Sequence, residues 1–282
     1  SNIKNDDYKC FGVSAFNLSK KNSYPWDKLP NGEFFIPNIM LYINKGQYTL
    51  VFTKLIHKSS SSKKIIKSIE EELSLALKTK NENKKSLSSS YKDISKTDKN
   101  TYIKTIEKVI EKIKTTELEK VIVSKMAQYK TSRPFDFSAM INQMNKKYSN
   151  CFNFIFQISK NNFFIGSSPE NLLKLKNNTI YSDALAGTSK LKKDLNKEKE
   201  IHEHSFVIKY LKNSFKLFCS NVDTEQTKVL KLNYAYHLQT KIKGNLKKEK
   251  HILSILKNIY PSPALLGYPS EEALKTIEEN EQ

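Results

Sequence analysis

Arginine is almost absent from this sequence, although the net charge is strongly positive. The 282 residues carry a net charge of +19, yet Arg133 is the only arginine. Proteins that read DNA bases rely heavily on arginine, and the lysines here are spread along the whole chain rather than gathered in one stripe. We therefore expect a lysine-covered surface and no specific nucleic-acid partner, with weak adhesion to polyanions left open.

Long apolar runs and cysteine pairs are also missing. No stretch approaches the roughly 20 consecutive apolar residues that cross a membrane. Residues 1–4 are not followed by the apolar segment of a secretory signal. Cys10, Cys151 and Cys219 are odd in number and widely spaced, which favours reduced thiols over a disulfide framework. These absences predict a cytoplasmic protein with no membrane partner.

What the sequence contains is an alternation of short apolar runs with amphipathic segments. Strand-like runs lie at 34–37, 39–43, 48–52, 120–126, 151–158, 163–165, 172–175 and 229–242. Helical spacing of apolar residues lies at 65–77, 102–115, 137–148, 194–218 and 252–259. A hairpin turn is expected at 44–47. Ser270 is expected to cap a last helix whose first turn holds Glu271 and Glu272.

One polar segment suggests where the chain divides. Residues 78–100 are nearly free of large apolar side chains, so we interpret them as a loop or linker. The resulting soft boundary separates residues 1–97 from residues 98–282. The earlier strands are expected to belong to the same fold as the later ones.

A bend between two short apolar strands holds a candidate acid. Glu170 follows a proline there, and because proline cannot donate to a sheet ladder, Glu170 is expected to leave the ladder. A third apolar run ends at Gly187, where the lack of a side chain lets a ligand approach the backbone. Together these two turns could form a small-anion pocket. Taken alone, the stretch is explained better by two ordinary hairpin turns.

The longest predicted helix, residues 194–218, carries two glutamates beside its apolar stripe. The expected core stripe consists of Ile201, Ile208, Leu211, Phe215 and Phe218. Glu200 and Glu203 lie three residues apart on a different face, so both could point into one site; a solvated helix face is the usual alternative. His202 and His204 are two residues apart and point in different directions, so a zinc pair is not expected.

Six motifs in order make the sequence resemble the chorismate-utilising enzymes, which include isochorismate, salicylate, anthranilate and aminodeoxychorismate synthases. The motifs are 120–125 (KVIVSK), 164–172 (FIGSSPENL), 184–188 (ALAGT), 199–204 (KEIHEH), 237–240 (HLQT) and 260–264 (YPSPA) with Gly267 and Pro269. Each motif alone is weak, but their shared order across residues 120–269 is specific. The resemblance implies an α+β fold of stacked, antiparallel-rich sheets flanked by helices.

The resemblance assigns the catalytic roles. Isochorismate and salicylate synthases carry a lysine where Lys120 stands, as the base that activates water. Other branches usually have glutamine there, and the aminodeoxychorismate branch often has lysine where Ala186 stands, so this pair of residues points to water as the nucleophile. Glu170 matches the acid that protonates the departing hydroxyl. Burial suits both roles, because it can neutralise a lysine and keep a carboxyl protonated. In isolation, Lys120 could instead be the solvent end of a strand and Glu170 a turn residue.

The resemblance also implies a Mg²⁺ ion and a set of substrate contacts. Glu203 matches the family's metal-binding carboxylate, and Glu200 matches an acidic position close to the metal. Oxygen ligands of this kind suit Mg²⁺. Gly187, Thr188 and His237 match positions that contact the substrate, with Ala186 beside them. His237 could otherwise be an ordinary core histidine.

Family members continue beyond the point where this sequence stops. Their later strands carry a second metal-binding glutamate, together with a lysine and an arginine that bind substrate carboxylates. We therefore expect the last strands of the fold to be missing here and the 282-residue polypeptide to be inactive or nearly so. A normal turnover number would refute that expectation.

The function that the resemblance implies is isochorismate synthase, a Mg²⁺-dependent isomerase acting on chorismate as a monomer. Menaquinone supply is the commoner purpose of such enzymes, and siderophore supply is the next. One alternative is a salicylate synthase, which adds pyruvate elimination at the same site. The other is a non-catalytic basic binding protein on a decayed enzyme scaffold. Product analysis distinguishes a salicylate synthase from an isochorismate synthase. The genomic sequence beyond residue 282 distinguishes a non-catalytic binding protein from an enzyme.

Overall fold

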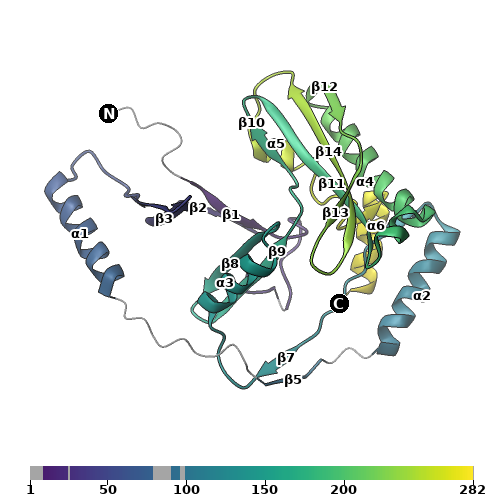
Figure 1. Ribbon diagram of the computed structural model, residues 1–282, viewed down its shortest axis with the longest axis horizontal. Helices are drawn as coiled ribbons and strands as arrows, with labels where there is room; N and C mark the ends of the chain where they lie inside the picture. The colour runs from purple at the N-terminus through teal and green to yellow at the C-terminus, as the bar shows by residue number, and fades with distance from the viewer. Residues whose placement is uncertain (1–8, 25, 79–89, 96–98, 282) are drawn as a thin grey trace. The chain divides into compact units, whose positions relative to one another are not determined.

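The computed structural model describes residues 9–24, 26–78, 90–95 and 99–281 (Figure 1). The chain divides into two compact units. The first consists of Ser1–Lys85 with Gln157–Phe163, and the second of Ser86–Phe156 with Phe164–Gln282. The domain boundary predicted after residue 97 lies outside the described residues. In the part of the chain that is described, no helix is long and apolar enough to cross a membrane.

The first unit is built from two hairpins and a helix. Its elements are β1 (Phe11–Ser14), β2 (Gly32–Phe35), β3 (Ile39–Asn44), β4 (Gln47–Phe52) and α1 (Ser62–Lys78). Strands β1 and β2 pair antiparallel, as do β3 and β4. Lys45 and Gly46 join β3 to β4 with φ angles of 47° and 81°, which two-residue hairpin turns require. The hairpin turn predicted at 44–47 is therefore confirmed.

The second unit is centred on an antiparallel sheet with strand order β10-β11-β14-β12, in which β13 also pairs with β14. The sheet strands are β10 (Lys174–Lys176), β11 (Thr179–Ser189), β12 (Cys219–Thr224), β13 (Lys228–Lys231) and β14 (Tyr236–Leu246). Smaller pairs are formed by β5 (Tyr91–Asp93) with β7 (Tyr129–Thr131) and by β6 (Lys120–Val121) with β15 (Gly267–Tyr268). Strands β8 (Phe152–Ser159) and β9 (Asn162–Ser168) form a further pair, of which residues Gln157–Phe163 belong to the first unit. The helices are α2 (Lys99–Thr115), α3 (Phe137–Lys147), α4 (Glu198–Lys216), α5 (Ile252–Leu256) and α6 (Ser270–Asn280), with a 3₁₀ turn at Lys192–Asn196. This mixture of helices and antiparallel strands confirms the predicted α+β class.

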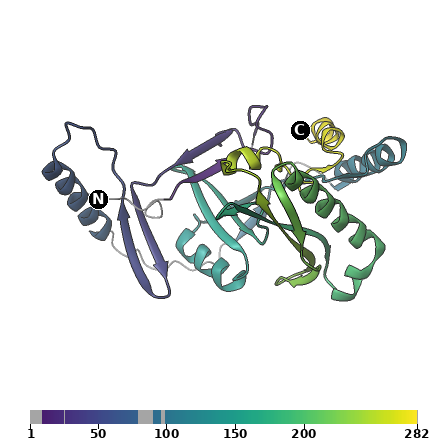
Figure 2. The ribbon, with the colours of Figure 1, turned by 90° about the horizontal axis from the view of Figure 1, so that it is seen from above.

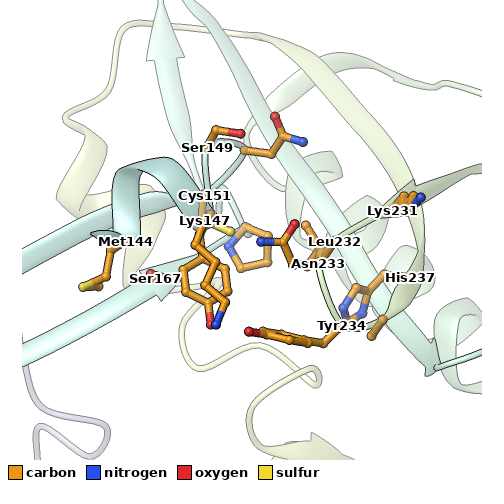
Figure 3. A pocket seen from close by; sticks show the side chains of 14 residues that line it. Met144, Lys147, Ser149, Cys151, Ser167, Lys231, Leu232, Asn233, Tyr234 and His237 are labelled. Carbon is orange, nitrogen blue, oxygen red and sulfur yellow. The ribbon is translucent and has the colours of Figure 1, made fainter. Parts of the chain in front are cut away.

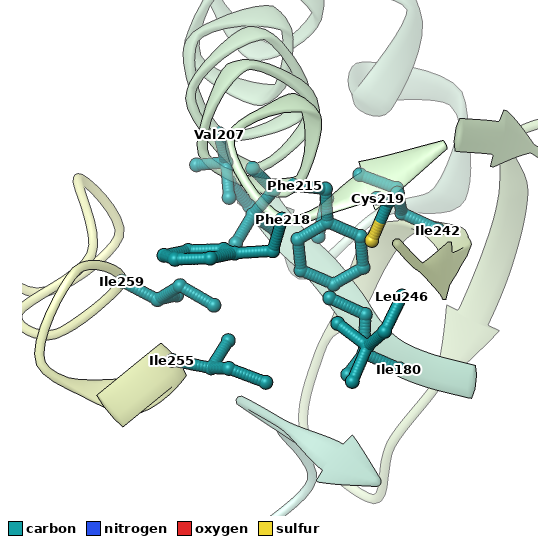
Figure 4. Packing of buried hydrophobic residues seen from close by; sticks show 12 residues of the cluster. Ile180, Val207, Phe215, Phe218, Cys219, Ile242, Leu246, Ile255 and Ile259 are labelled. Carbon is teal, nitrogen blue, oxygen red and sulfur yellow. The ribbon is translucent and has the colours of Figure 1, made fainter. Parts of the chain in front are cut away.

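Helix α4 covers one face of this sheet, as both views of the ribbon show (Figures 1 and 2). Val207 and Phe215 of the helix are fully buried, as are Ile180 of β11 and Ile242 of β14. Ile255 and Ile259, from α5 and the turn after it, join the same cluster (Figure 4). Burying side chains of this size contributes about 1.5–3 kcal/mol each. The packing fixes the height and rotation of α4 over the strands.

The first turn of α4 lies differently from the prediction. The helix begins at Glu198 rather than at residue 194, and Ile201 is 53% exposed instead of belonging to the core stripe. Glu200 is buried in its place, because its carboxylate accepts a hydrogen bond from a strand backbone below it. The buried face continues through His204 and Val207. A polar contact, which apolar periodicity does not reveal, therefore sets the rotation of this end.

Three further elements differ from the sequence pattern. The run at 229–242 is a hairpin of β13 and β14, closed by a hydrogen bond from the Leu232 N–H to the Ala235 carbonyl (2.8 Å). The run at 120–126 forms a strand only over Lys120–Val121, because its partner β15 has two residues. Pro269, not Ser270, is the N-cap of α6. The two glutamates predicted in the first turn of α6 are confirmed.

Gly187 lies at a close approach of α4 to β11. It marks an irregularity in the β11–β14 register and has a φ of +72°. A Cβ atom there would lie 2.8 Å from the backbone oxygen of Glu200. Only glycine meets both constraints without strain.

Replacing Gly187 by alanine is expected to lower the free energy of unfolding by roughly 1–3 kcal/mol, through left-handed strain and the clash with α4. Urea unfolding of both proteins measures the change. Gly46→Ala is the control, because Gly46 also has a positive φ but no atom within 4 Å of its Cβ position. Equal effects of the two substitutions would contradict a role for the close approach of α4.

Candidate active site

The side chain of Lys120 is held in a buried position by a short strand pair. Strand β6 pairs with β15, so that Lys120 lies opposite Tyr268. The side-chain amine donates a hydrogen bond to the Pro263 carbonyl (3.1 Å) and lies 3.2 Å from Oε1 of Glu203. Lys120 is only 9% exposed. A Cβ atom on Gly267 would collide with the Lys120 carbonyl, so glycine is needed to bring the two strands this close.

The two glutamates of α4 point to different partners. Glu203 is partly exposed and forms the ion pair with Lys120. The buried Glu200 accepts a hydrogen bond through Oε2 from the backbone N–H of Thr188 (2.8 Å), and its Oε1 lies 3.6 Å from the amine of Lys199. Helix α4 thus connects the Lys120 region to the β11 bulge.

The bulge in β11 brings the predicted substrate contacts together. Ala186 is buried and Thr188 is exposed on either side of Gly187. The Thr188 hydroxyl lies 2.9 Å from Nδ1 of His237, which is its paired residue on the neighbouring strand β14. Burial lowers the pKa of His237, which favours the neutral imidazole at neutral pH. A hydroxyl and a neutral imidazole can exchange hydrogen bonds with a polar ligand.

Glu170 lies in a setting that favours its protonated form. Strand β9 ends at Ser168, so Glu170 leaves the ladder after the proline as predicted. Burial, and next the charge of Asp183, raise the pKa of Glu170 to about 7, while the positive charge of Lys120 opposes them. Glu170 and Lys120 are therefore close enough to interact electrostatically. A carboxyl with such a pKa can donate a proton near neutral pH.

Asp183 was missed by sequence reasoning. Its N–H donates to the Asn171 carbonyl (3.0 Å), which fixes β11 directly beside the Glu170 segment. Burial raises the pKa of Asp183 itself, and the charge of Lys241 is the largest influence that opposes it. A sequence signal for Asp183 existed, since it is the only charged residue between Thr179 and Ser189 and lies three residues before Ala186.

A pocket of about 450 Å³ opens next to these groups (Figure 3). His237 and Pro169 line it, so it adjoins both the Thr188–His237 pair and the Glu170 turn. The end of α3 and the β13–β14 turn form other parts of its wall. Its volume lies within the range of pockets for small molecules.

Comparison with known proteins identifies the family. A sequence model of the family described as "Chorismate binding enzyme" matches residues 1–282. The chain belongs to this family. Isochorismate synthase MenF of Bacillus subtilis is 25% identical to this chain over 285 residues, which cover 96% of the chain and 59% of the relative. The chloroplastic isochorismate synthase of Catharanthus roseus is 30% identical over 198 residues, covering 65% of the chain and 34% of the relative.

A solved structure agrees with the fold of this family member. The menaquinone-specific isochorismate synthase MenF of Escherichia coli superposes with a TM-score of 0.78 at 22% identity, covering 98% of this chain and 63% of that one. The predicted chorismate-binding-enzyme fold is thus confirmed. The chain spans 59% and 34% of the lengths of the two curated relatives named above.

The carboxylates present are compatible with a Mg²⁺ ion shared with a substrate. Among the described residues, no group of three or more His, Cys, Asp or Glu side chains could hold a metal on its own. Mg²⁺ usually needs only one or two protein carboxylates, with water and substrate oxygens completing its shell. Glu203, partly exposed and bonded through one oxygen, fits this need best. One oxygen of Glu200, Oε2, already accepts the hydrogen bond from Thr188. Only its other oxygen, Oε1, is left to serve as a metal ligand.

Replacing Asp183 by asparagine is expected to lower the pKa of Glu170, because the charge of Asp183 raises it. If Glu170 acts as an acid, the fall of kcat at alkaline pH should move to lower pH. A pH–rate profile measures this. Asp223→Asn is the control, since Asp223 is a half-exposed carboxylate on the outer strand β12 that pairs with Lys243 of β14. A shift of the same size in both variants, or a shift upward, would contradict the expectation.

Proposed function

We propose that this chain provides the base, the acid and part of the metal site of an isochorismate synthase. The observation that carries the proposal is a buried lysine whose charge acts on a carboxyl of raised pKa. Lys120 and Glu170 interact electrostatically, and Glu203 lies 3.2 Å from the Lys120 amine. The relatives named isochorismate synthase support the choice of reaction.

The proposed reaction is an isomerisation in which one water enters and one leaves. Lys120 takes a proton from the water that forms a bond to C2 of chorismate. The ring double bonds shift, and the bond from C4 to its hydroxyl breaks. Glu170 gives its proton to that hydroxyl, which departs as water. Both proton transfers suit groups placed on either side of one ring.

The remaining residues would hold the substrate. Mg²⁺ bound by Glu203, with Glu200 nearby, would neutralise the ring carboxylate of chorismate. The backbone at Ala186 and Gly187 and the Thr188–His237 pair would contact polar groups of the ring. Glu200 would also keep the bulge in place, because it accepts the Thr188 N–H. We also propose that the protein acts as a monomer in the cytoplasm.

The direct test is product analysis with chorismate and Mg²⁺. It should be run on the 282-residue chain and on the longest natural polypeptide that contains it. Isochorismate that accumulates in either assay supports the proposal. Salicylate with pyruvate would establish a salicylate synthase instead. No conversion by either polypeptide would favour a non-catalytic binding protein.

A further inference from the structure

The pocket beside the candidate site contains a group of hydrogen-bond donors that the proposed reaction does not use. Lys147 is the last residue of α3, and its amine lies 5.0 Å from the centre of the Tyr234 ring and 5.9 Å from that of Tyr148. The two rings are 6.1 Å apart. The Tyr234 hydroxyl is hydrogen-bonded to both the Lys147 amine and the Tyr148 hydroxyl. In Figure 3 the side chains of Lys147 and Tyr234 point toward each other in the wall of the pocket.

The charge of the pocket wall has one sign. Lys147 and Lys231 line it together with His237, and none of the described residues that line it is an aspartate or glutamate. An ammonium group and phenolic hydroxyls are donors suited to a carboxylate. Tyr234 is 60% exposed, so its ring offers an open apolar surface next to these donors. The wall therefore favours a small organic acid with a flat or cyclic body.

The position of the pocket connects it to the candidate active site. His237 lines the pocket and also contacts Thr188. Pro169 lines it and immediately precedes Glu170. A molecule held at Lys147 would therefore share the pocket with His237 and with Pro169, the residue before the acid.

We propose that Lys147, Tyr148 and Tyr234 form a docking subsite that binds one carboxylate of the incoming substrate before it reaches Lys120 and Glu170. The inference rests on the proposed function, since it takes chorismate, a dianion, as the ligand. Lys147 is a positioning residue and takes no part in proton transfer. The subsite raises the local concentration of an anionic substrate through charge, which makes capture dependent on salt.

The test compares two neighbouring lysines. Lys147→Gln should raise KM for chorismate by about fivefold to tenfold, the effect of a charge-assisted hydrogen bond reduced by exposure to solvent, with kcat unchanged. It should also weaken the salt dependence of kcat/KM. Lys146→Gln is the matched control, because Lys146 lies in the same last turn of α3 and is exposed, but does not line the pocket. Equal KM values for the two variants would overturn the proposal, as would a loss confined to kcat.

Calorimetric titration with chorismate separates this proposal from the proposed function. If no isochorismate forms but Lys147→Gln alone weakens chorismate binding, the subsite stands and the reaction assignment falls. If turnover is normal and the Lys147→Gln and Lys146→Gln variants bind chorismate equally, only the docking subsite is refuted. Tyr234→Phe, which keeps the ring and removes the hydroxyl, should weaken binding less than Lys147→Gln. Circular dichroism checks that each variant is folded.

Discussion

Replacing Lys120 by glutamine is expected to lower kcat for isochorismate formation by about 10²–10⁴-fold, the usual contribution of a general base. Glutamine is similar in length but cannot accept the proton of the attacking water. Because Lys120 is buried and contacts Glu203, the substitution also leaves that carboxylate without its partner. Steady-state rates with saturating chorismate and Mg²⁺, on whichever polypeptide is active, measure the effect.

The control for this substitution lies five residues along the same motif. Lys125 is exposed and its amine rests 5.7 Å from the centre of the Tyr102 ring. Lys125→Gln should leave kcat within about twofold, as expected for a surface substitution away from the site. Unfolding midpoints of both variants show whether any loss reflects stability. A Lys120→Gln enzyme that keeps a tenth or more of the wild-type rate would exclude Lys120 as the base.

Glu170→Gln is expected to lower kcat by about 10²–10⁴-fold, because the departing hydroxyl loses its proton donor. The pH–rate profile of the wild-type enzyme should also show the titration of Glu170. Burial raises the pKa of Glu170 to about 7, so the acid is protonated below that pH and the rate should fall as pH rises through it. The residual rate of Glu170→Gln should lack this fall. A wild-type rate that stays flat across pH 7 would contradict the assignment.

The same substitution has an opposite effect on stability. A carboxyl whose pKa is raised in the folded state contributes stability that is fully present below its unfolded pKa, and this contribution is lost as pH rises through the folded value of about 7. Glutamine carries no charge to bury. Glu170→Gln should therefore unfold at a higher temperature than the wild type at alkaline pH, with the difference shrinking under acid. A combination of lost activity and gained stability is typical of a strained functional group.

Local sequence patterns predicted what depends on neighbouring residues. The β3–β4 turn follows from the residues at its own positions, and the departure of Glu170 from the ladder follows from the preceding proline. The family motifs predicted the fold for a different reason, since their order and spacing along the chain match those of the family. Their order also directed attention to Lys120, Glu203 and Glu170, and in the structure Lys120 lies within electrostatic reach of both glutamates. Their catalytic roles remain proposals.

What the sequence did not reveal depends on partners far along the chain. Apolar periodicity placed Ile201 in the core, because it could not show that Glu200 turns inward to reach a strand N–H. Asp183 affects Glu170 only because β11 lies beside the Glu170 turn. The cluster at Lys147 needs the β13–β14 turn, which was hidden inside a run that resembled one long strand. These contacts are set by register and packing.

The carbonyl that anchors the Lys120 amine lies 143 positions later in the chain. A ribosome must therefore complete most of this sequence before the amine can find its partner, and contacts of such long separation form slowly. Before β15 has been synthesised and has paired with β6, Lys120 lacks this partner strand. If Lys120 acts as proposed, a chain that ends before Pro263 would lack the carbonyl that holds its amine.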